Sequence, residues 1–389
     1  MLSPAPCVRF PRCDNPRVQL GYFTMPVHPP ERPIAETLRE DRDAIVLADA
    51  LGFDEAFVGE HLTDRRETIT SSLLFLASLV PVTTRIRLGA GTVNLGLRHP
   101  LVVAAEVAML DHLSCGRVVL GLSAGALATD AEALGIDPED RNRRFAEALD
   151  VLLACWREAG APALDVRLPG NRFEVSTRKT CVPELRIGEI YPPLQRPHPE
   201  LLGTIVAAEP RGAVLMGERG ISPLSAPFTH PALLARHWSA YAEGCRRAGN
   251  EPDRDRWRIA RAVFVADDAR DARRYGGSDG PYGEYFRLLG AKLERVGKAG
   301  VFRPDGSGGD RMPPLAEVLA SHVIAGTPDE VADAIVGLAR ITGGFGRLLY
   351  AGLDWKEPRL ARRSLELMAH EVMPLVKRAL GTVSDVPGA

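Results

Sequence analysis

Apolar runs of strand length alternate with amphipathic helical runs through the first 160 residues. In the stretch 36–51, Ala44, Leu47, Ala48 and Leu51 share one face of a helix, and Gly52 ends it. The same alternation predicts strands at 18–23, 55–61, 85–93 and 116–123, and helices at 36–51, 71–80, 100–113 and 139–159. Buried-type strands that are each followed by a helix predict a parallel sheet with helices outside it.

Two interruptions break this pattern in the rest of the chain. Residues 161–200 lose periodicity and are rich in proline, which predicts a long surface excursion, and residues 270–313 are rich in Gly, Arg and Pro, which predicts a lid or a disordered loop. Outside them the pattern predicts strands at 204–208, 258–266 and 347–353, and helices after Pro210 and at 231–249, 327–340 and 358–380. Thr327, Pro328 and Glu330 form the start signal of the helix at 327–340.

Roughly eight strand–helix units predict an α/β fold, a (β/α)8 TIM barrel. A doubly wound sheet is the alternative architecture. The barrel is expected to be one domain over residues 18–380, with insertions near 161–200 and 270–313. We interpret residues 1–17 as an N-terminal extension, because they lack the apolar core of a signal peptide, and residues 381–389 as a C-terminal tail.

Composition narrows the function classes. The 389 residues are 45% hydrophobic and 25% charged, which is typical of a globular protein with a large core. A net charge of -2 and a pI near 6.5 give no electrostatic signal for nucleic acid or anionic membrane. The six cysteines are scattered without a C-x-x-C pair, which predicts reduced thiols in a cytoplasmic protein. No dinucleotide-binding, Walker A or H-E-x-x-H motif is present.

The stretch "GLSAG" at 121–125 matches the G-x-S-x-G pattern of α/β-hydrolases. A nucleophilic Ser123 would need a histidine, an acidic residue and an upstream oxyanion loop, and the sequence has no H-G-G loop. The pattern also arises by chance in a chain with 37 glycines. A serine hydrolase, a structural serine and a small residue lining a cofactor are the alternatives at this position.

Several stretches together resemble the bacterial luciferase-like, flavin-dependent monooxygenases. They are "LADALGFDEAFVGEH", "RIRLGAGTVNLGLRHPLVVAAEVAMLDHLSCGRVVLGLSAG", "TDAEALGID", "VAAEPRGAVLMGERG" and "GTPDEVADAIVGLARITGGFGRLLYAGLDW". The last is similar to the limonene-monooxygenase-like branch in particular. The resemblance covers most of residues 18–380 and is weak over 160–200 and 270–313.

The resemblance implies a TIM barrel that binds FMN at the carboxyl ends of its strands. In this family a separate NAD(P)H:flavin reductase supplies reduced FMN, which reacts with O2 to give a flavin C4a-(hydro)peroxide that oxygenates a small organic substrate. A related branch uses the deazaflavin F420 for hydride transfer, so an F420-dependent oxidoreductase is an alternative, as is a flavin-binding barrel without turnover. We expect a cytoplasmic homodimer with no metal site.

The resemblance also places candidate residues at the strand ends. Glu60 and His61 end the strand at 55–61 and are the candidate catalytic residues, because an imidazole can exchange a proton near neutral pH. A histidine satisfied by Glu60 or by the backbone is the alternative. Many relatives read Glu-His-His here, whereas this chain has Leu62 as the third residue.

The remaining candidates are expected to bind the cofactor. Strand glycines admit the close approach of a planar ring, or else mark a plain kink. A helix N-terminus attracts phosphate and Arg211 adds a charged fork, unless Arg211 is an ordinary surface residue. Glu209 is expected to turn away from a phosphate. The expected ring contacts are Gly91, Thr92, Asn94, Ser123 and Gly125, and the expected phosphate contacts are Ala208, Glu209, Arg211 and Gly212.

Overall fold

The computed structural model describes residues 18–24, 27–307, 309–353 and 355–381, which form two compact units. The first unit holds Val58–Arg65 and Ile69–Leu201, and the second holds residues 18–57, Arg66–Thr68 and the residues from 202 onward. The expected extension at 1–17 and, apart from Gly381, the tail at 381–389 lie outside the described residues.

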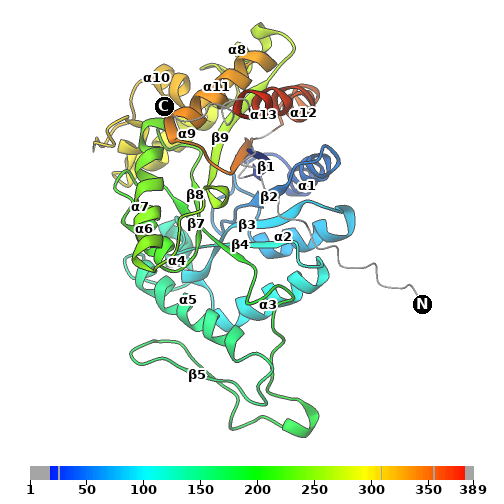
Figure 1. Ribbon diagram of the computed structural model, residues 1–389, viewed down its shortest axis with the longest axis vertical. Coiled ribbons are helices and arrows are strands. Elements are labelled where there is room, and N and C mark those ends of the chain that lie inside the picture. The colour runs from blue at the N-terminus through cyan, green and yellow to red at the C-terminus, as the bar shows by residue number, and fades with distance from the viewer. Residues whose placement is uncertain (1–17, 25–26, 308, 354, 382–389) are drawn as a thin grey trace, which may run out of the picture. The chain divides into compact units, whose positions relative to one another are not determined.

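The first unit is built on two adjacent parallel strands (Figure 1). Strand β3 (Arg87–Asn94) pairs with β4 (Val118–Ser123) from Leu88 opposite Val118 to Asn94 opposite Ser123, with a register shift between Ala90 and Val93. Their side chains are buried almost throughout. The helices of this unit are α2 (Ser72–Leu79), α3 (Pro100–Leu113), α4 (Ala128–Ala133) and α5 (Arg141–Arg157).

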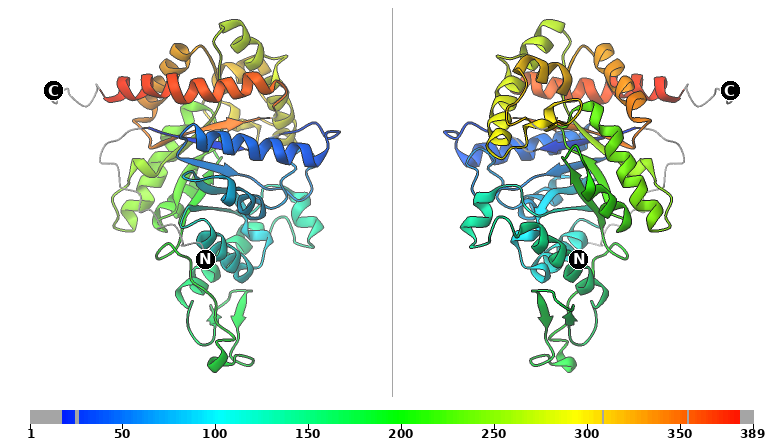
Figure 2. Two further views of the ribbon diagram at one scale, coloured as in Figure 1. Left: turned by 90° about the vertical axis from the view of Figure 1, so that its right-hand side faces the viewer. Right: turned by 90° about the vertical axis from the view of Figure 1, so that its left-hand side faces the viewer.

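The stretch between α5 and the second unit contains a small antiparallel hairpin. Strands β5 (Asp165–Arg167) and β6 (Glu174–Ser176) pair with Asp165 opposite Ser176, and the green segment that carries them leads away from α5 (Figure 2). Gln195 ties the end of the stretch back to the unit, because its side chain donates to the Asp111 carboxylate and to the Val118 carbonyl, at 2.8 and 2.9 Å.

The second unit contains most of the parallel strands. Strand β1 (Gln19–Thr24) pairs with β11 (Arg347–Gly352), β11 with β9 (Arg258–Val265), β9 with β8 (Ser222–Ser225), and β8 with β7 (Glu200–Ile205). Strand β2 (Glu55–Val58) continues from this unit into the first, and β10 (Val323–Gly326) adds a further parallel strand beside β9. The helices are α1 (Ile34–Ala50), α6 (Arg211–Glu218), α7 (Leu234–Arg247), α8 (Ala269–Gly276), α9 (Pro281–Arg295), α10 (Leu315–His322), α11 (Pro328–Thr342), α12 (Pro358–Leu367) and α13 (Met373–Gly381).

The fold is a (β/α)8 barrel, which confirms the sequence-based prediction and excludes the doubly wound alternative. Among the described residues, the barrel strands are β1, β2, β3, β4, β7, β8, β9 and β11, all parallel, and β9 also pairs with β8 to complete the ring. The expected start of α11 is confirmed as well, because Thr327 and Glu330 form a reciprocal capping box ahead of Pro328.

Of the two alternatives predicted for 270–313, a lid or a disordered loop, the disordered loop was wrong. The segment contains α8 and α9, and Tyr275, Tyr282 and Phe286 on these helices are buried. Its glycines misled the pattern, because some of them are packing positions. A Cβ on Gly290 would lie 2.4 Å from the Met312 sulfur. The Gly content therefore reflects close helix packing rather than a flexible chain.

Among the described residues, six further short elements escaped the sequence pattern: α4, α10, β5, β6, β8 and β10. Strand β8 reads Ser-Pro-Leu-Ser, which has too few apolar residues to announce a strand, yet all four residues are buried. Tertiary packing selects the strand here, against the usual reading of Pro and Ser as loop residues.

Glycines also set the distance between α6 and α7. A Cβ on Gly244 would lie 2.0 Å from the Val214 carbonyl oxygen, and one on Gly217 would lie 2.3 Å from that of Tyr241. The backbones of α6 and α7 therefore touch directly, and neither glycine leaves room for a side chain. The described cysteines, Cys115, Cys155, Cys181 and Cys245, are free thiols.

Candidate functional site

Glu60 is a buried carboxylate whose oxygens are fully engaged. Oε2 accepts hydrogen bonds from the Ser72 backbone N–H at 2.8 Å and from the Ser72 hydroxyl at 2.7 Å, while Oε1 accepts from the Asn94 N–H at 2.8 Å. The Asn94 amide donates in turn to the Glu60 carbonyl at 3.1 Å. Glu60 thus joins the end of β2, the start of α2 and the end of β3 within the first unit.

His61 pairs with an aspartate that sequence reasoning did not single out. Its Nδ1 lies 3.2 Å from Oδ2 of Asp130 on α4, and the two side chains are 6% and 0% exposed as residues. Asp130 Oδ1 also accepts from the Thr63 N–H at 2.8 Å and the Thr63 hydroxyl at 2.6 Å. Burial alone would raise the pKa of Asp130, but the hydrogen bonds from His61 and Thr63 outweigh it and lower the pKa to about 2.

The ionised Asp130 determines the tautomer of the imidazole. A carboxylate can only accept, so Nδ1 of His61 carries the proton in this contact and Nε2 is the nitrogen that takes up or gives up a second proton. Glu60 does not hydrogen-bond to the ring, so the alternative in which Glu60 satisfies His61 does not hold, and Asp130 is the carboxylate that pairs with the imidazole. The quoted stretch "TDAEALGID" contains Asp130, and its place in the first turn after a barrel strand was the available signal.

A second cluster joins the ends of β3 and β4. The Thr92 hydroxyl donates to Ser123 Oγ at 2.7 Å, and Ser123 Oγ donates to Asn94 Oδ1 at 3.0 Å. The Gly125 N–H also points to Ser123 Oγ, at 3.3 Å. Through Asn94 this cluster continues to Glu60, so the structure brings together five of the predicted residues by direct hydrogen bonds within the first unit.

The glycines near this cluster shape the backbone. The register shift of β3 lies between Ala90 and Val93, so the expected bulge around Gly91 and Thr92 is present, and the peptide bond between these two residues is cis. Gly125 has φ +92°, a conformation that side chains rarely adopt, and a Cβ there would approach Leu97 to 3.0 Å. Gly125 is half-buried and gives a stretch of backbone without a side chain beside the Thr92–Ser123–Asn94 cluster, whereas Gly91 is buried at the bulge of β3.

The hydrolase alternative for Ser123 lacks its base. The hydroxyl is committed to Thr92, Asn94 and the Gly125 backbone, and none of the described histidines hydrogen-bonds to it. A serine nucleophile needs a general base within hydrogen-bond reach. Ser123 is therefore a hydrogen-bonded member of the Thr92–Ser123–Asn94 cluster rather than a nucleophile.

The expected phosphate segment lies in the second unit, at the start of α6. Arg211 and Gly212 are exposed, and Arg211 forms no hydrogen bond or ion pair through its side chain with any described residue. Most of the first amides of this helix are already hydrogen-bonded. The Arg211 and Ala213 N–H groups donate to the backbone carbonyls of Glu209 and Pro210, whereas the Gly212 N–H has no described partner. Glu209 is highly exposed and lies 3.7 Å from Arg236, and Ala208 is half-buried.

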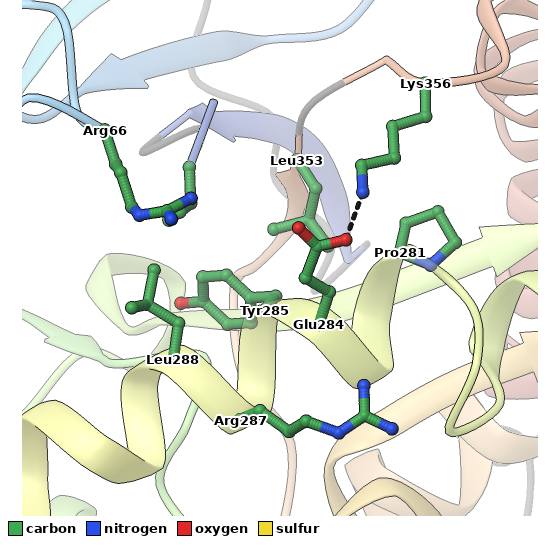
Figure 3. Close-up of a pocket in the computed structure, with 9 residues that line it drawn as sticks. Arg66, Pro281, Glu284, Tyr285, Arg287, Leu288, Leu353 and Lys356 are labelled. Carbon is green, nitrogen blue, oxygen red and sulfur yellow. Dashed lines mark hydrogen bonds and ion pairs between the residues drawn. The ribbon is translucent and has the colours of Figure 1, made fainter. Parts of the chain in front are cut away.

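A separate cavity of about 320 Å³ lies within the second unit along α9 (Figure 3). Its wall combines apolar and charged side chains, and an ion pair between Lys356 and Glu284 spans part of it. Such a wall suits a small organic molecule with an apolar body and an acceptor group. The side chains that line it include Arg66, Tyr285, Arg287, Leu288 and Leu353.

Two broad features of the described residues complete the picture. Within the described ranges, no helix combines the length and apolar character that crossing a membrane would require. The same ranges contain no group of three His, Cys, Asp or Glu side chains arranged to hold a metal ion.

Comparison with known proteins identifies the family. The sequence model of the luciferase-like monooxygenases matches residues 18–343. The 4-hydroxyprotoasukamycin monooxygenase of Streptomyces nodosus subsp. asukaensis is 34% identical over 382 residues, covering 95% of both chains. Limonene 1,2-monooxygenase of Rhodococcus erythropolis is 30% identical over 374 residues, covering 95% of this chain and 89% of the relative.

A solved structure extends the comparison to three dimensions. The oxygenating constituent of 3,6-diketocamphane monooxygenase from Pseudomonas putida, a type II Baeyer–Villiger monooxygenase in complex with FMN, superposes with a TM-score of 0.82 at 26% identity. The match covers 92% of this chain and 98% of that one. Fold and relatives together define an oxidoreductase of the monooxygenase class on a (β/α)8 barrel. The chain belongs to the luciferase-like monooxygenase family, as its sequence motifs predicted.

Proposed function

We propose that this protein is an FMN-dependent monooxygenase that inserts one oxygen atom of O2 into a small organic substrate. The observation that carries the proposal is the buried pair of His61 and Asp130. Glu60, the residue before His61, is hydrogen-bonded to Asn94 and so to the Thr92–Ser123–Asn94 cluster. The pair can move a proton. The Thr92–Ser123–Asn94 cluster offers short polar side chains to a planar ring, and Gly125 beside it offers backbone without a side chain. The FMN complex of the diketocamphane enzyme supports the choice of cofactor.

The residues present fit FMN. We assign Gly91, Thr92, Asn94, Ser123 and Gly125 to the isoalloxazine ring. Gly125 is half-buried and has no side chain, Gly91 lies at the bulge of β3, and the other three carry hydroxyl and amide groups. Arg211 and the Gly212 N–H are assigned to the phosphate, since both are donors without a described partner at a helix start. Ala208 and Glu209 precede that helix, and Glu209 faces Arg236 instead of offering a donor.

Bound reduced FMN supplies the two electrons with which O2 is split, so that one oxygen atom enters the substrate and the other leaves as water. His61 is the proposed proton donor, acting through Nε2, while Asp130 holds Nδ1 and stabilises the charged ring. We assign Glu60 a positioning role, because its oxygens are taken up by Ser72 and Asn94 and it fixes the Asn94 side chain.

We further propose that a separate NAD(P)H:flavin reductase supplies the reduced flavin and that the oxygenase is a homodimer. The diketocamphane relative is described as the oxygenating constituent of its enzyme, which supports a division between two proteins. An F420-dependent oxidoreductase is the competing function on this barrel.

The decisive experiment separates binding from turnover. Reduced FMN and reduced F420 would each be titrated anaerobically into the purified chain, and the loaded protein would then be mixed with isotopically labelled 18O2 and a panel of small terpenoids and cyclic ketones. We expect tight binding of reduced FMN and one labelled oxygen in a product. Preferential binding of F420, or label recovered solely in hydrogen peroxide and water with every compound, would contradict the proposal.

A further inference from the structure

Arg261 on β9 has a buried guanidinium group, and two of its nitrogen atoms have no hydrogen-bond partner among the described residues. The residue is 1% exposed, and its Nη1 donates to the carbonyls of Pro227 and Thr229, at 3.2 and 2.7 Å. Its Nε and Nη2 atoms are also buried and have no hydrogen-bond partner among the described residues. No described carboxylate forms an ion pair with it, and burial lowers the pKa of Arg261 to about 9.

Arg258, three residues earlier on the same strand, shows what the Nε and Nη2 atoms of a buried arginine bind in this protein. Nε and Nη2 of Arg258 donate to the two carboxylate oxygens of Glu55, at 2.7 and 2.8 Å, and both side chains are fully buried. Nε and Nη2 form the parallel fork that matches a carboxylate. Arg261 presents the same two donors without a Glu55 of its own.

Two further buried polar atoms beside Arg261 have no described partner. They are Oγ1 of Thr229, whose carbonyl already binds Arg261, and Nε2 of His322. His322 Nδ1 lies 2.9 Å from the Val318 carbonyl and 2.8 Å from the Ser321 hydroxyl. Because a carbonyl only accepts, we assign the proton to Nδ1 and a lone pair to Nε2. The Phe228 carbonyl lies close to His322, but its geometry falls short of a hydrogen bond to Nε2.

The neighbouring histidines do not balance the charge of Arg261, because they are basic groups held neutral. Burial, and next the charge of Arg261, lowers the pKa of His230 and lowers that of His322 to about 3. Burial also lowers the pKa of His237 to about 4, and Arg261 adds to this effect. At neutral pH the guanidinium is therefore a buried positive charge for which the described residues supply no anion.

We propose that Arg261, Thr229 and His322 form a binding site for a small planar oxyanion of the carboxylate or hydrogencarbonate type. A buried charge without a counter-charge is strongly unfavourable, and an unsatisfied buried donor in a folded protein commonly marks a bound ion or water. An oxyanion on the Nε–Nη2 edge would make the two hydrogen bonds that Glu55 makes with Arg258. The Thr229 hydroxyl would donate to it as well.

Aromatic side chains limit the size of the ligand. The His322 ring lies 5.4 Å from the ring of Phe302 and 5.7 Å from that of Phe286, both fully buried, and 5.6 Å from the ring of His230. Because these rings pack around His322, we propose a ligand of only a few atoms. A hydrogencarbonate ion differs from formate in having an O–H group, which His322 Nε2 could accept.

The site is tested by anion-dependent stability of the full-length protein at neutral pH. Sodium formate and sodium hydrogencarbonate would be titrated against sodium chloride at equal ionic strength, with the midpoint of thermal unfolding as the readout. We expect a saturable rise of about 5 °C over chloride with at least one of the two anions, since a ligand that binds the folded state stabilises it. Stronger binding of hydrogencarbonate, lost in His322→Phe, would identify it as the ligand over a free carboxylate.

Variants test whether the anion-dependent stabilisation requires the Nε and Nη2 donors of Arg261. Arg261→Lys keeps the charge but not the two parallel donors, so its anion affinity should fall about tenfold or more. Arg261→Met should abolish the response, Thr229→Val should weaken it, and Arg246→Met, a change at an exposed arginine of α7, should leave it intact. Equal responses in the wild type and Arg261→Met would mean that the anion binds elsewhere, and no response above chloride would mean that no anion binds the Nε–Nη2 edge. Either result would overturn the site. If Arg261→Met does not fold, calorimetric affinities of Arg261→Lys and Thr229→Val decide the question by the same comparison.

Discussion

Nδ1 of His61 lies 3.2 Å from Oδ2 of Asp130, a residue 69 positions later in the chain. His61 follows the end of β2 and Asp130 lies in the first full turn of α4, and both side chains are buried. The contact sets which ring nitrogen carries the permanent proton, so it determines how His61 can act in the proposed reaction. Two of the predictions below depend on it.

Replacement of His61 should separate flavin binding from oxygenation. We expect His61→Ala to keep near-normal affinity for reduced FMN but to lower product formation by ~10²–10⁴-fold, because a positioned acid–base group contributes that much. Hydrogen peroxide should rise relative to product. The measurement is the ratio of product to hydrogen peroxide in a single turnover, and His61→Asn should recover part of the product if a donor suffices. An unchanged ratio with normal flavin affinity would assign His61 a structural role.

Asp130 should make the stability of the protein depend on pH in a defined window. Its pKa is about 2 in the folded protein, whereas an unfolded aspartate titrates near 4. The ionised carboxylate therefore stabilises the fold above about pH 4, and this contribution, about 2 kcal/mol, is lost as the pH falls from about 4 to about 2.

The check is urea unfolding of the wild type and Asp130→Asn as a function of pH. The variant should be less stable at neutral pH, and the gap should shrink below about pH 4. Asp333→Asn, at an exposed position of α11, should show no such gap. A gap that stays constant down to the acid limit would refute the linkage between Asp130 and folding.

Arg211 should contribute to phosphate binding but not to ring binding. A charge-assisted hydrogen bond is worth roughly 1.5–3 kcal/mol, so Arg211→Ala should weaken FMN binding about ten- to hundredfold. Riboflavin, which lacks the phosphate, should bind the variant and the wild type alike, and Arg246→Ala should affect neither ligand. Equal losses for FMN and riboflavin in Arg211→Ala would locate the phosphate elsewhere. Both affinities can be measured by fluorescence titration.

Alanine at two glycines of the second unit, Gly244 and Gly337, should change the free energy of unfolding in opposite directions. Gly244→Ala places a Cβ against the Val214 carbonyl and should cost about 1–3 kcal/mol of unfolding free energy, because overpacking forces the backbones apart. Gly337→Ala, in α11, meets no atom within 4 Å and should stabilise the helix by up to about 1 kcal/mol. Denaturant unfolding measures both. A loss at Gly337 as large as the loss at Gly244 would show that close helix contact is not the cause.

Local patterns were sufficient for much of the fold. The alternation of strand and helix predicted the barrel, and Thr327, Pro328 and Glu330 announced α11, because helix starts and strand runs are encoded within a few consecutive residues. Glu60, Asn94 and Ser123 became candidates through the family resemblance and their place at the ends of predicted strands, since the carboxyl ends of barrel strands share one face. Their role in the reaction stays a prediction.

Tertiary structure decided the contacts between residues that are distant in sequence. Asp130 became the partner of His61, Ser-Pro-Leu-Ser became a strand, and the glycine-rich stretch at 270–313 became two helices. Arg261 lies in a stretch that reads simply as a strand, and burial turned it into an uncompensated charge. Hydrophobic periodicity reports which face of an element is buried, whereas these outcomes depend on which groups burial brings together, and that is settled when the packed elements must satisfy their polar atoms at the same time.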